Sequence, residues 1–285
     1  VPVYLNNNIT NMHTPSKTSV TVTKAWDDAN DQDGIRPGSV IVKLLADGED
    51  TGKTEELNAA NQWTATFGDL DEYKEGQKIV YTIEEVDVTG YTSVITGDAE
   101  TGYTITNTHT PEVIGINGSK TWDDNDNQDG ARPESITIRL LANGTEIDSK
   151  TVTEADDWAW SFTELPKFES GTEIVYAVTE DAVSDYTVEY DGYNVTNTHT
   201  PGKTSVTVSK AWDDASDQDG IRPGSVTVKL LADGEDTGKT LELSASGSWR
   251  GSFTDLDEYK NGKKVTYTVE EKEVAGYTSV ISGDA

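Results

Sequence analysis

The sequence contains no cysteine, which excludes disulfide bonds, thiolate zinc sites and cysteine nucleophiles. It also lacks an apolar run approaching the roughly 20 residues of a membrane-spanning helix, and it shows no signal peptide or anchor motif, so we expect an internal segment of a longer protein. Positive charge is scarce, because 22 Lys plus Arg stand against 52 Asp plus Glu, for a formal net charge of −30. Since this field repels phosphates and anionic lipid, we expect neither nucleic-acid binding nor membrane insertion.

Three copies of one pattern run along the chain. A Lys-x-Trp-Asp-Asp motif begins at Lys24, Lys120 and Lys210, at spacings of 120 − 24 = 96 and 210 − 120 = 90 residues. Each copy continues with an Asp-Gly-x-Arg-Pro turn. A closing motif, Thr-Asn-Thr-His-Thr-Pro, ends the first two copies, and a variant with Met in place of the second Thr precedes the first copy. The repeats therefore set the domain organisation.

We predict four segments from this pattern. They are the closing strand of a preceding repeat at 1–15, which could act as a donor strand, and repeats at 16–111, 112–201 and 202–285, the third lacking its last strand. Thr, Val, Ile and Tyr alternate with polar residues over short runs between Gly, Asp and Asn turns, which predicts an all-β protein of tandem β-sandwiches. The short His-Thr-Pro junctions favour a rod.

Three polar residues of each repeat fall on the apolar face of their strands. Because side chains alternate between the two faces of a strand, Lys24 shares a face with Val20 and Val22, and Glu85 and Asn107 continue the apolar faces of their own strands. The equivalent inward residues are Lys120, Glu180 and Asn197 in the second repeat and Lys210 and Glu271 in the third. The neighbouring Glu84 and Glu270 have the outward parity.

The inward residues have two interpretations. In one, Lys and Glu form a buried ion pair bonded to Asn, or lie at strand ends and reach water. In the other they react, since burial favours a neutral, nucleophilic Lys amine and a neutral Glu that can shuttle protons. Amine attack on the Asn side-chain carbonyl, with loss of ammonia, would form an isopeptide bond between the first and last strands of the repeat.

Several motifs in fixed order resemble a known family, the B-type repeat domains of Cna-like surface proteins of Gram-positive bacteria, also found in pilins. The matching elements are Lys-x-Trp-Asp-Asp, Asp-Gly-x-Arg-Pro, Tyr-x-Val/Ile-x-Glu and Thr-Asn-Thr-His, over essentially the whole chain. The resemblance implies prealbumin-like, inverse immunoglobulin-type sandwiches with self-formed isopeptide bonds. It implies bonds Lys24–Asn107 and Lys120–Asn197, with Glu85 and Glu180 as the assisting acids.

The two ends of the pattern are incomplete. Lys210 and Glu271 have no Asn after them, and Asn11 has no Lys before it. One explanation is a cut through a longer array. The other is strand donation, in which the segment from Asn8 to His13 completes the third repeat of another copy. An intermolecular Lys210–Asn11 bond would then build a head-to-tail fibre.

Other polar clusters favour structural roles. The acidic turn at 125–130 partly resembles a calcium loop, but its twelfth position is Ile136 rather than a bidentate Glu, so we expect an Asx turn. The single His of each closing motif, at His13, His109 and His199, is expected to end a strand. With no phosphate loop, zinc spacing or nucleophile elbow in the sequence, we expect no cofactor and no metal.

We expect a structural stalk or fibre module on the surface or cell wall of a Gram-positive bacterium. Its chemistry would be internal and single-turnover, so we do not expect an enzyme. Its partners would be neighbouring copies of the same chain or array. The alternative is an adhesin repeat that binds a host extracellular matrix protein such as collagen or fibrinogen. The near identity of the first and third repeats favours the stalk, because a dedicated binding site usually breaks repeat symmetry.

Overall fold

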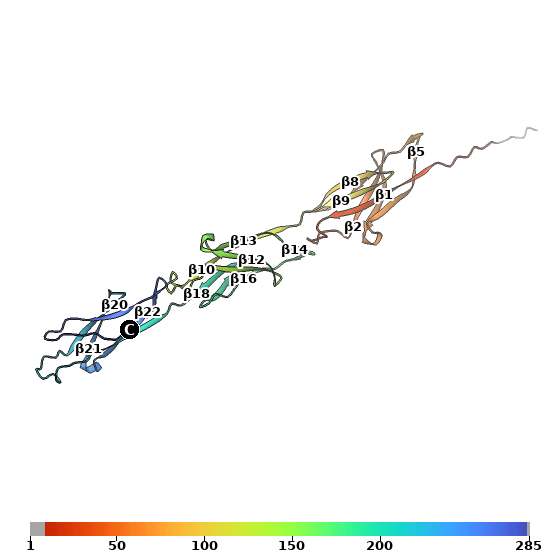
Figure 1. The fold of residues 1–285 in the computed structure, drawn as a ribbon. Coiled ribbons are helices and arrows are strands. Elements are labelled where there is room, and N and C mark those ends of the chain that lie inside the picture. Colours follow the sequence, from red (N-terminus) through yellow and green to blue (C-terminus); the bar gives the residue numbers. More distant parts are fainter. Residues whose placement is uncertain (1–8, 284–285) are drawn as a thin grey trace, which may run out of the picture. The chain divides into compact units, whose positions relative to one another are not determined.

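The computed structural model describes residues 9–283 and is built almost wholly from β-strands (Figure 1). The first repeat contains β1 (Lys17–Asp27), β2 (Ser39–Ala46), β3 (Glu49–Asn58), the 3-10 turn η1 (Ala59–Asn61), β4 (Thr64–Asp71), β5 (Tyr73–Lys74), β6 (Gln77–Lys78), β7 (Tyr81–Glu85), β8 (Thr92–Asp98) and β9 (Gly102–Thr108). Its two larger sheets have the strand orders β4-β1-β9-β8 and β3-β2-β7, and β5 and β6 pair as a separate hairpin. Strands β1 and β9, the first and last of the repeat, are parallel neighbours.

The second repeat follows the same order, and the third follows it as far as the counterpart of β7. The second contains β10 (Val113–Asp123), β11 (Ser135–Ala142), β12 (Thr145–Thr153), η2 (Glu154–Asp156), β13 (Ala159–Pro166), β14 (Phe168–Glu169), β15 (Thr172–Glu173), β16 (Tyr176–Glu180), β17 (Thr187–Asp191) and β18 (Asn194–Thr198). The third contains β19 (Lys203–Ser209), β20 (Ser225–Ala232), β21 (Glu235–Ser244), η3 (Ala245–Gly247), β22 (Arg250–Asp257), β23 (Tyr259–Lys260), β24 (Lys263–Lys264) and β25 (Tyr267–Glu271). Strands β10 and β18 repeat the parallel pairing of β1 and β9.

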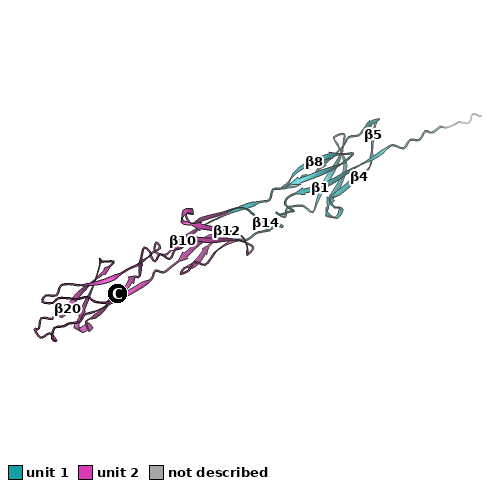
Figure 2. Ribbon diagram, viewed as in Figure 1, with its two compact units in different colours: residues 1–115, 163–175 teal, residues 116–162, 176–285 magenta. Residues whose placement is uncertain are grey.

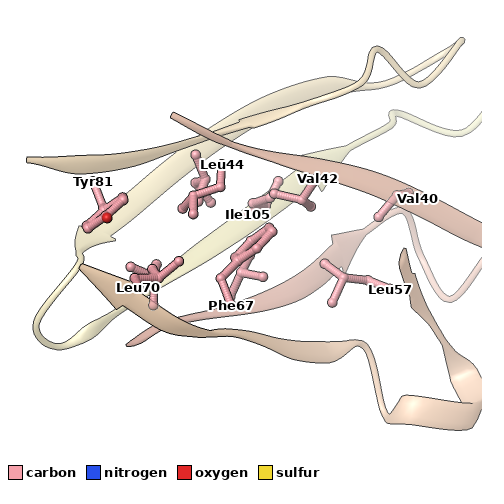
Figure 3. Packing of buried hydrophobic residues seen from close by; sticks show 11 residues of the cluster. Val40, Val42, Leu44, Leu57, Phe67, Leu70, Tyr81 and Ile105 are labelled. Carbon is pink, nitrogen blue, oxygen red and sulfur yellow. The ribbon is translucent and has the colours of Figure 1, made fainter. Parts of the chain in front are cut away.

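The core of the first repeat lies between its two sheets. Alternating residues of β1 and β2 point inward, among them Val20, Val22 and Leu44, each with no exposed surface. Phe67, Leu70 and Ile105 belong to the same cluster, and Figure 3 shows them packed near Leu44 and Val42. This alternation of buried and exposed residues reproduces the period of two that predicted the strands.

The third repeat shows what the closing strand contributes. In the first repeat, residues 24–27 at the end of β1 pair with β9, and β8 pairs with β9 as well. No strand of the described chain occupies the β9 position beside β19, so β19 ends at Ser209 and residues 272–283 form no strand. The backbone groups of a strand need a neighbour for their hydrogen bonds, and here that neighbour is missing.

The described part of the segment predicted as a closing strand, residues 9–15, forms no strand within a single chain, so its pairing with another repeat stays a prediction. Residues 9–16 have no regular structure and are exposed, Ile9 by 86% and Met12 by 93%, because no partner strand lies beside them in the chain. The earlier part of that segment, including Asn8 of the expected donor strand, lies outside the described residues.

The chain forms two compact units (Figure 2). One comprises the described part of Val1–Gly115 together with Thr163–Val175, and the other comprises Ile116–Phe162 with the described part of Tyr176–Ala285. The hairpin β14–β15 of the second repeat thus belongs to the unit of the first repeat. Within residues 9–283, no helix has the length and apolar character needed to cross a membrane.

Candidate isopeptide-bond sites

Lys24 carries a buried amine in the first repeat. It lies on the inner face of β1 and is 4% exposed. Its Nζ is 3.5 Å from Glu85 Oε1, 3.1 Å from the carbonyl oxygen of Ala25 and 4.2 Å from the ring centroid of Trp26. Burial lowers the Lys24 pKa from 10.5 to about 8, although the nearby Glu85 opposes this shift. A larger fraction of the amine is therefore neutral at neutral pH than for a surface lysine.

Asn107 lies in β9, which pairs in parallel with β1, and is fully buried. The register places Ile105 opposite Lys24 and Asn107 opposite Trp26, so Lys24 and Asn107 are diagonal neighbours on the inner face. Within residues 9–283, neither the amide nitrogen nor the amide oxygen of Asn107 has a hydrogen-bond partner. A buried polar group without a partner is costly, so the site needs an explanation.

Glu85 approaches from the opposite sheet. It ends β7, pairs with Val42 of β2 and is 9% exposed. A cavity of about 370 Å³ is lined by Glu85 and Asn107 together with Tyr91 and Ser93. The structure therefore brings together the three residues that strand parity placed in the core. The neighbouring Glu84 is exposed and lies 3.4 Å from Lys43 on the surface.

The second repeat holds the same three residue types. Lys120 is 6% exposed, and its Nζ is 2.6 Å from Glu180 Oε1. Asn197 is 1% exposed and pairs with Trp122 across β10 and β18, and its side-chain oxygen makes no hydrogen bond. Burial lowers the Lys120 pKa, and Glu180 opposes the shift. Two repeats thus present a buried lysine, glutamate and asparagine on equivalent strands.

The third repeat holds only two of the three residues. Lys210 Nζ is 2.9 Å from Glu271 Oε1, and Glu270 is exposed, as Glu84 is. The side chains of Lys210 and Glu271 are 16% and 9% exposed, against 0% and 3% for Lys24 and Glu85. Asn11 lies in the exposed segment before β1, in the other compact unit.

Sequence reasoning gave no role to a polar network beside the site. Asp28 is 2% exposed and accepts two hydrogen bonds from Arg36, at 2.6 and 3.0 Å, and one from the Tyr91 hydroxyl at 2.9 Å. These bonds, that of Arg36 above all, hold the Asp28 pKa at about 2. The Tyr91 ring packs edge-on against Trp26, 5.0 Å between centroids. The sequence did contain a signal for this network, because an Asp and an Arg recur at the positions of Asp28 and Arg36 in every repeat.

The carboxylates of the acidic turns accept hydrogen bonds from other groups of the chain. Asp124 accepts hydrogen bonds from Arg132 and from the backbone N–H of Asn127, as an Asx turn does. Asp129 accepts a hydrogen bond from the backbone N–H of Gly202. Across residues 9–283, no group of three or more His, Cys, Asp and Glu side chains is placed to hold a metal ion.

The site geometry suits one reaction class. A buried amine with a lowered pKa, an unbonded carboxamide and a carboxylate that can move protons are the components of an acyl transfer from Asn to Lys. Because the acceptor and donor belong to the same folded chain, their reaction would occur once per site. The same three groups would otherwise be a buried ion pair beside an unsatisfied amide.

Three of the matches to known proteins describe the relationship. The profile of the Cna protein B-type domain matches residues 20–108, 116–198 and 206–285. A collagen adhesin of Staphylococcus aureus is 48% identical over 278 residues, which cover 97% of this chain and 24% of that protein, so the chain spans about a quarter of this relative. A crystal structure of two B repeat units of the S. aureus collagen-binding protein is 48% identical, with a TM-score of 0.61, over 94% of this chain and 73% of that chain.

These matches confirm the family resemblance and the all-β fold of tandem prealbumin-like β-sandwiches. The matched segments contain each Lys-x-Trp-Asp-Asp motif and each acidic turn that carried the resemblance. The chain therefore belongs to the Cna protein B-type domain family.

Proposed function

We propose that the chain is a stalk segment of a bacterial surface adhesin, locked by Lys24–Asn107 and Lys120–Asn197 isopeptide bonds. The observation that carries the proposal is that a lysine, a glutamate and an asparagine lie together with buried side chains in two repeats, with the Asn107 amide left without hydrogen bonds to the described residues. The collagen adhesin relative supports a place outside the cell, on its surface or wall.

In the proposed reaction, the neutral Nζ of Lys24 attacks Cγ of Asn107. Glu85 takes a proton from the attacking amine and delivers it to the Asn107 Nδ2, which leaves as ammonia. The Nζ–Cγ bond forms, the Cγ–Nδ2 bond breaks, and no oxidant or cofactor is consumed. The product removes the charge of a buried ammonium and joins two buried groups that are otherwise poorly satisfied. The chain turns over no external substrate in this reaction, so it acts as a structural protein rather than an enzyme.

The bond would stabilise each repeat by closing a long loop. It would join β1 to β9 across 107 − 24 = 83 residues, and β10 to β18 across 197 − 120 = 77 residues. For loops of this length the chain-entropy model gives a stabilisation of roughly 4 kcal/mol. Such a lock suits an extracellular stalk without cysteine, since it needs no oxidising environment.

The third repeat supports an intermolecular extension of the proposal. Its Lys210–Glu271 pair is formed and partly accessible to solvent. The exposed closing motif around Asn11 would add a strand beside β19 of another copy and supply the missing carboxamide. Purified chain boiled in detergent is then expected to show a ladder of multimers that Lys210→Arg abolishes. Monomers alone would contradict this extension.

Intact mass under denaturing conditions tests the internal bonds. The expected mass is lower than that of the sequence by two ammonia molecules per chain. Asn107→Ala should eliminate one ammonia loss and retain the other. Glu84→Gln, which alters the exposed neighbour of Glu85, is the matched control and should retain both. The full sequence mass in the unaltered chain would overturn the proposal and leave Lys24 and Lys120 as ordinary paired lysines.

A second function is direct binding of a host matrix protein such as collagen or fibrinogen. The observation that favours it is the 48% identity to a protein named a collagen adhesin, although the chain covers only 24% of that protein. Surface plasmon resonance on immobilised collagen and fibrinogen distinguishes the two functions. A stalk segment should give no saturable binding on either surface, whereas saturable binding would support the adhesin function.

A further inference from the structure

The acidic turn of the first repeat contacts the repeat that follows it. Asp33 Oδ2 accepts a hydrogen bond of 2.8 Å from the backbone N–H of Glu112 and lies 2.9 Å from Nε2 of His109. The other ring nitrogen of His109 is 2.9 Å from the carbonyl oxygen of Gly90. Both ring nitrogens thus face acceptors, which the doubly protonated imidazolium satisfies. The turn, the closing motif and the start of the second repeat are tied together at Asp33.

The same turn receives the tip of the β14–β15 hairpin. The N–H of Gly171 donates to the carbonyl oxygen of Gln32 at 3.0 Å. A Cβ added to Gly34 would lie 2.4 Å from the Cα of Gly171, so no larger residue fits at this position. The two glycines meet backbone to backbone, and any side chain on Gly34 would push the hairpin away.

The second compact unit contains an independent copy of this joint. The N–H of Gly262, at the tip of the β23–β24 hairpin, donates to the carbonyl oxygen of Gln128 at 2.9 Å. A Cβ on Gly130 would lie 2.6 Å from the Cα of Gly262. Asp129 Oδ2 accepts from the N–H of Gly202 at 2.7 Å. The same positions of the repeat make the same contacts twice.

One half of the joint is free at each of two further places. In the third repeat, the turn carries Gln218, Asp219 and Gly220 in the same order, all exposed. In the first repeat, the β5–β6 hairpin carries Gly76 at its tip. No atom of the described residues 9–283 lies within 4 Å of a Cβ built on Gly220 or Gly76, although both glycines have positive φ, as their counterparts in the occupied joints do.

We infer that the Asp-Gly turn of each repeat is a docking socket for the glycine hairpin of the next repeat. The free socket at Gly220 takes the hairpin of a further repeat of this type, such as the Gly76 hairpin of a second copy of the chain. This inference stands apart from the isopeptide bonds, since none of the joint residues belongs to the Lys–Glu–Asn sites.

Spin labels test the occupied joints. They can be attached to two introduced cysteines alone, since the chain has no native cysteine. Labels on exposed positions in Lys53→Cys/Ser149→Cys report the distance across the first joint. Gly34→Ala should broaden this distance distribution, whereas the matched control Gly220→Ala, with similar φ and no neighbour, should leave it unchanged. Asp33→Asn, with Asp219→Asn as its control, gives the same comparison without added bulk. Unchanged distributions in both Gly34→Ala and Asp33→Asn would overturn the socket.

The free socket is tested by self-association of the full chain. The tether between consecutive repeats gives an effective concentration on the order of millimolar, so separate copies should dock only at comparable chain concentrations. Amide chemical shifts around Gly220 and Gly76 should then move together as concentration rises. Gly220→Ala should abolish this concentration dependence of the chemical shifts, whereas Gly34→Ala should keep it. The two variants thus have the reverse of their effects in the spin-label experiment. If the chemical shifts of both glycines stay constant up to chain concentrations several-fold above the millimolar range, the socket does not take a second copy.

Discussion

Replacing Asn107 by alanine should cost the first repeat far more stability than a buried amide is ordinarily worth. The proposed bond closes a loop of 107 − 24 = 83 residues, and its loss should lower the free energy of unfolding by roughly 4 kcal/mol. The Asn107 amide makes no hydrogen bond in the structure, so its own hydrogen bonding contributes nothing to the loss. Truncating a side chain in a core without such a bond ordinarily costs about 0.5–3 kcal/mol.

A double-mutant cycle separates the bond from simple contact between the two side chains. Lys24→Met and Asn107→Ala each abolish the bond, so the double variant should be little less stable than either single variant. The expected coupling free energy is about 4 kcal/mol, above the 0.5–3 kcal/mol usual for residues in contact. Hydrogen exchange of the β1 and β9 amides measures the stability of this repeat within the full chain, and intact mass of each variant reports the bond.

One result would refute this reasoning. If the single-variant losses add to within about 0.5 kcal/mol, Lys24 and Asn107 are energetically independent and no bond joins them. Glu85→Gln provides a further check, because it preserves the shape of the core and removes the proton carrier. It should show the same exchange protection as Asn107→Ala and the same missing ammonia loss.

Three further outcomes are expected. Glu180→Gln should eliminate one of the two ammonia losses in intact mass, through the second repeat alone, and Glu84→Gln should eliminate none. Because folding lowers the Asp28 pKa to about 2, this residue should stabilise the first repeat by about 2 kcal/mol above about pH 3.8, and this stability should be lost as pH falls through about 2. In Asp28→Asn, the free energy of unfolding measured by hydrogen exchange should therefore fall less steeply in acid. The raised His109 pKa, caused first by the hydrogen bond to Asp33, stabilises the first joint below the unfolded pKa of 6.5. The spin-label distribution should therefore broaden as pH rises through the raised value, and His109→Gln should remove that pH dependence.

The inward lysine and glutamate could be predicted from the sequence because strand parity is a strictly local rule. Val20, Val22 and Lys24 alternate with polar residues, so an inward lysine follows from the period of two whatever the sheet order. The same rule chose Glu85 over Glu84, and the structure buries the first and exposes the second. What parity could not supply was the neighbour of each strand, since pairing depends on residues far apart in sequence.

The segment at 9–15 shows that a closing motif does not form a strand by itself. This segment has the same closing motif as β9 and β18 but forms no strand, because a strand needs a partner and none lies beside it. The end of β19 at Ser209 has the same origin. Strand formation in these segments is decided by pairing and not by composition.

The sequence by itself determined the repeat pattern, through motifs that recur along the chain. It also determined the alternating cores and the inward lysine, glutamate and asparagine, since these depend on spacing along one strand. Only the tertiary structure decided that β1 and β9 are parallel neighbours, which makes Lys24 and Asn107 adjacent. It also decided that the acidic turn of one repeat meets the hairpin of the next at Gly34 and Gly171. That contact joins residues 171 − 34 = 137 positions apart. It leaves no periodic signal, because a glycine kept for close backbone approach looks in the sequence like any turn glycine.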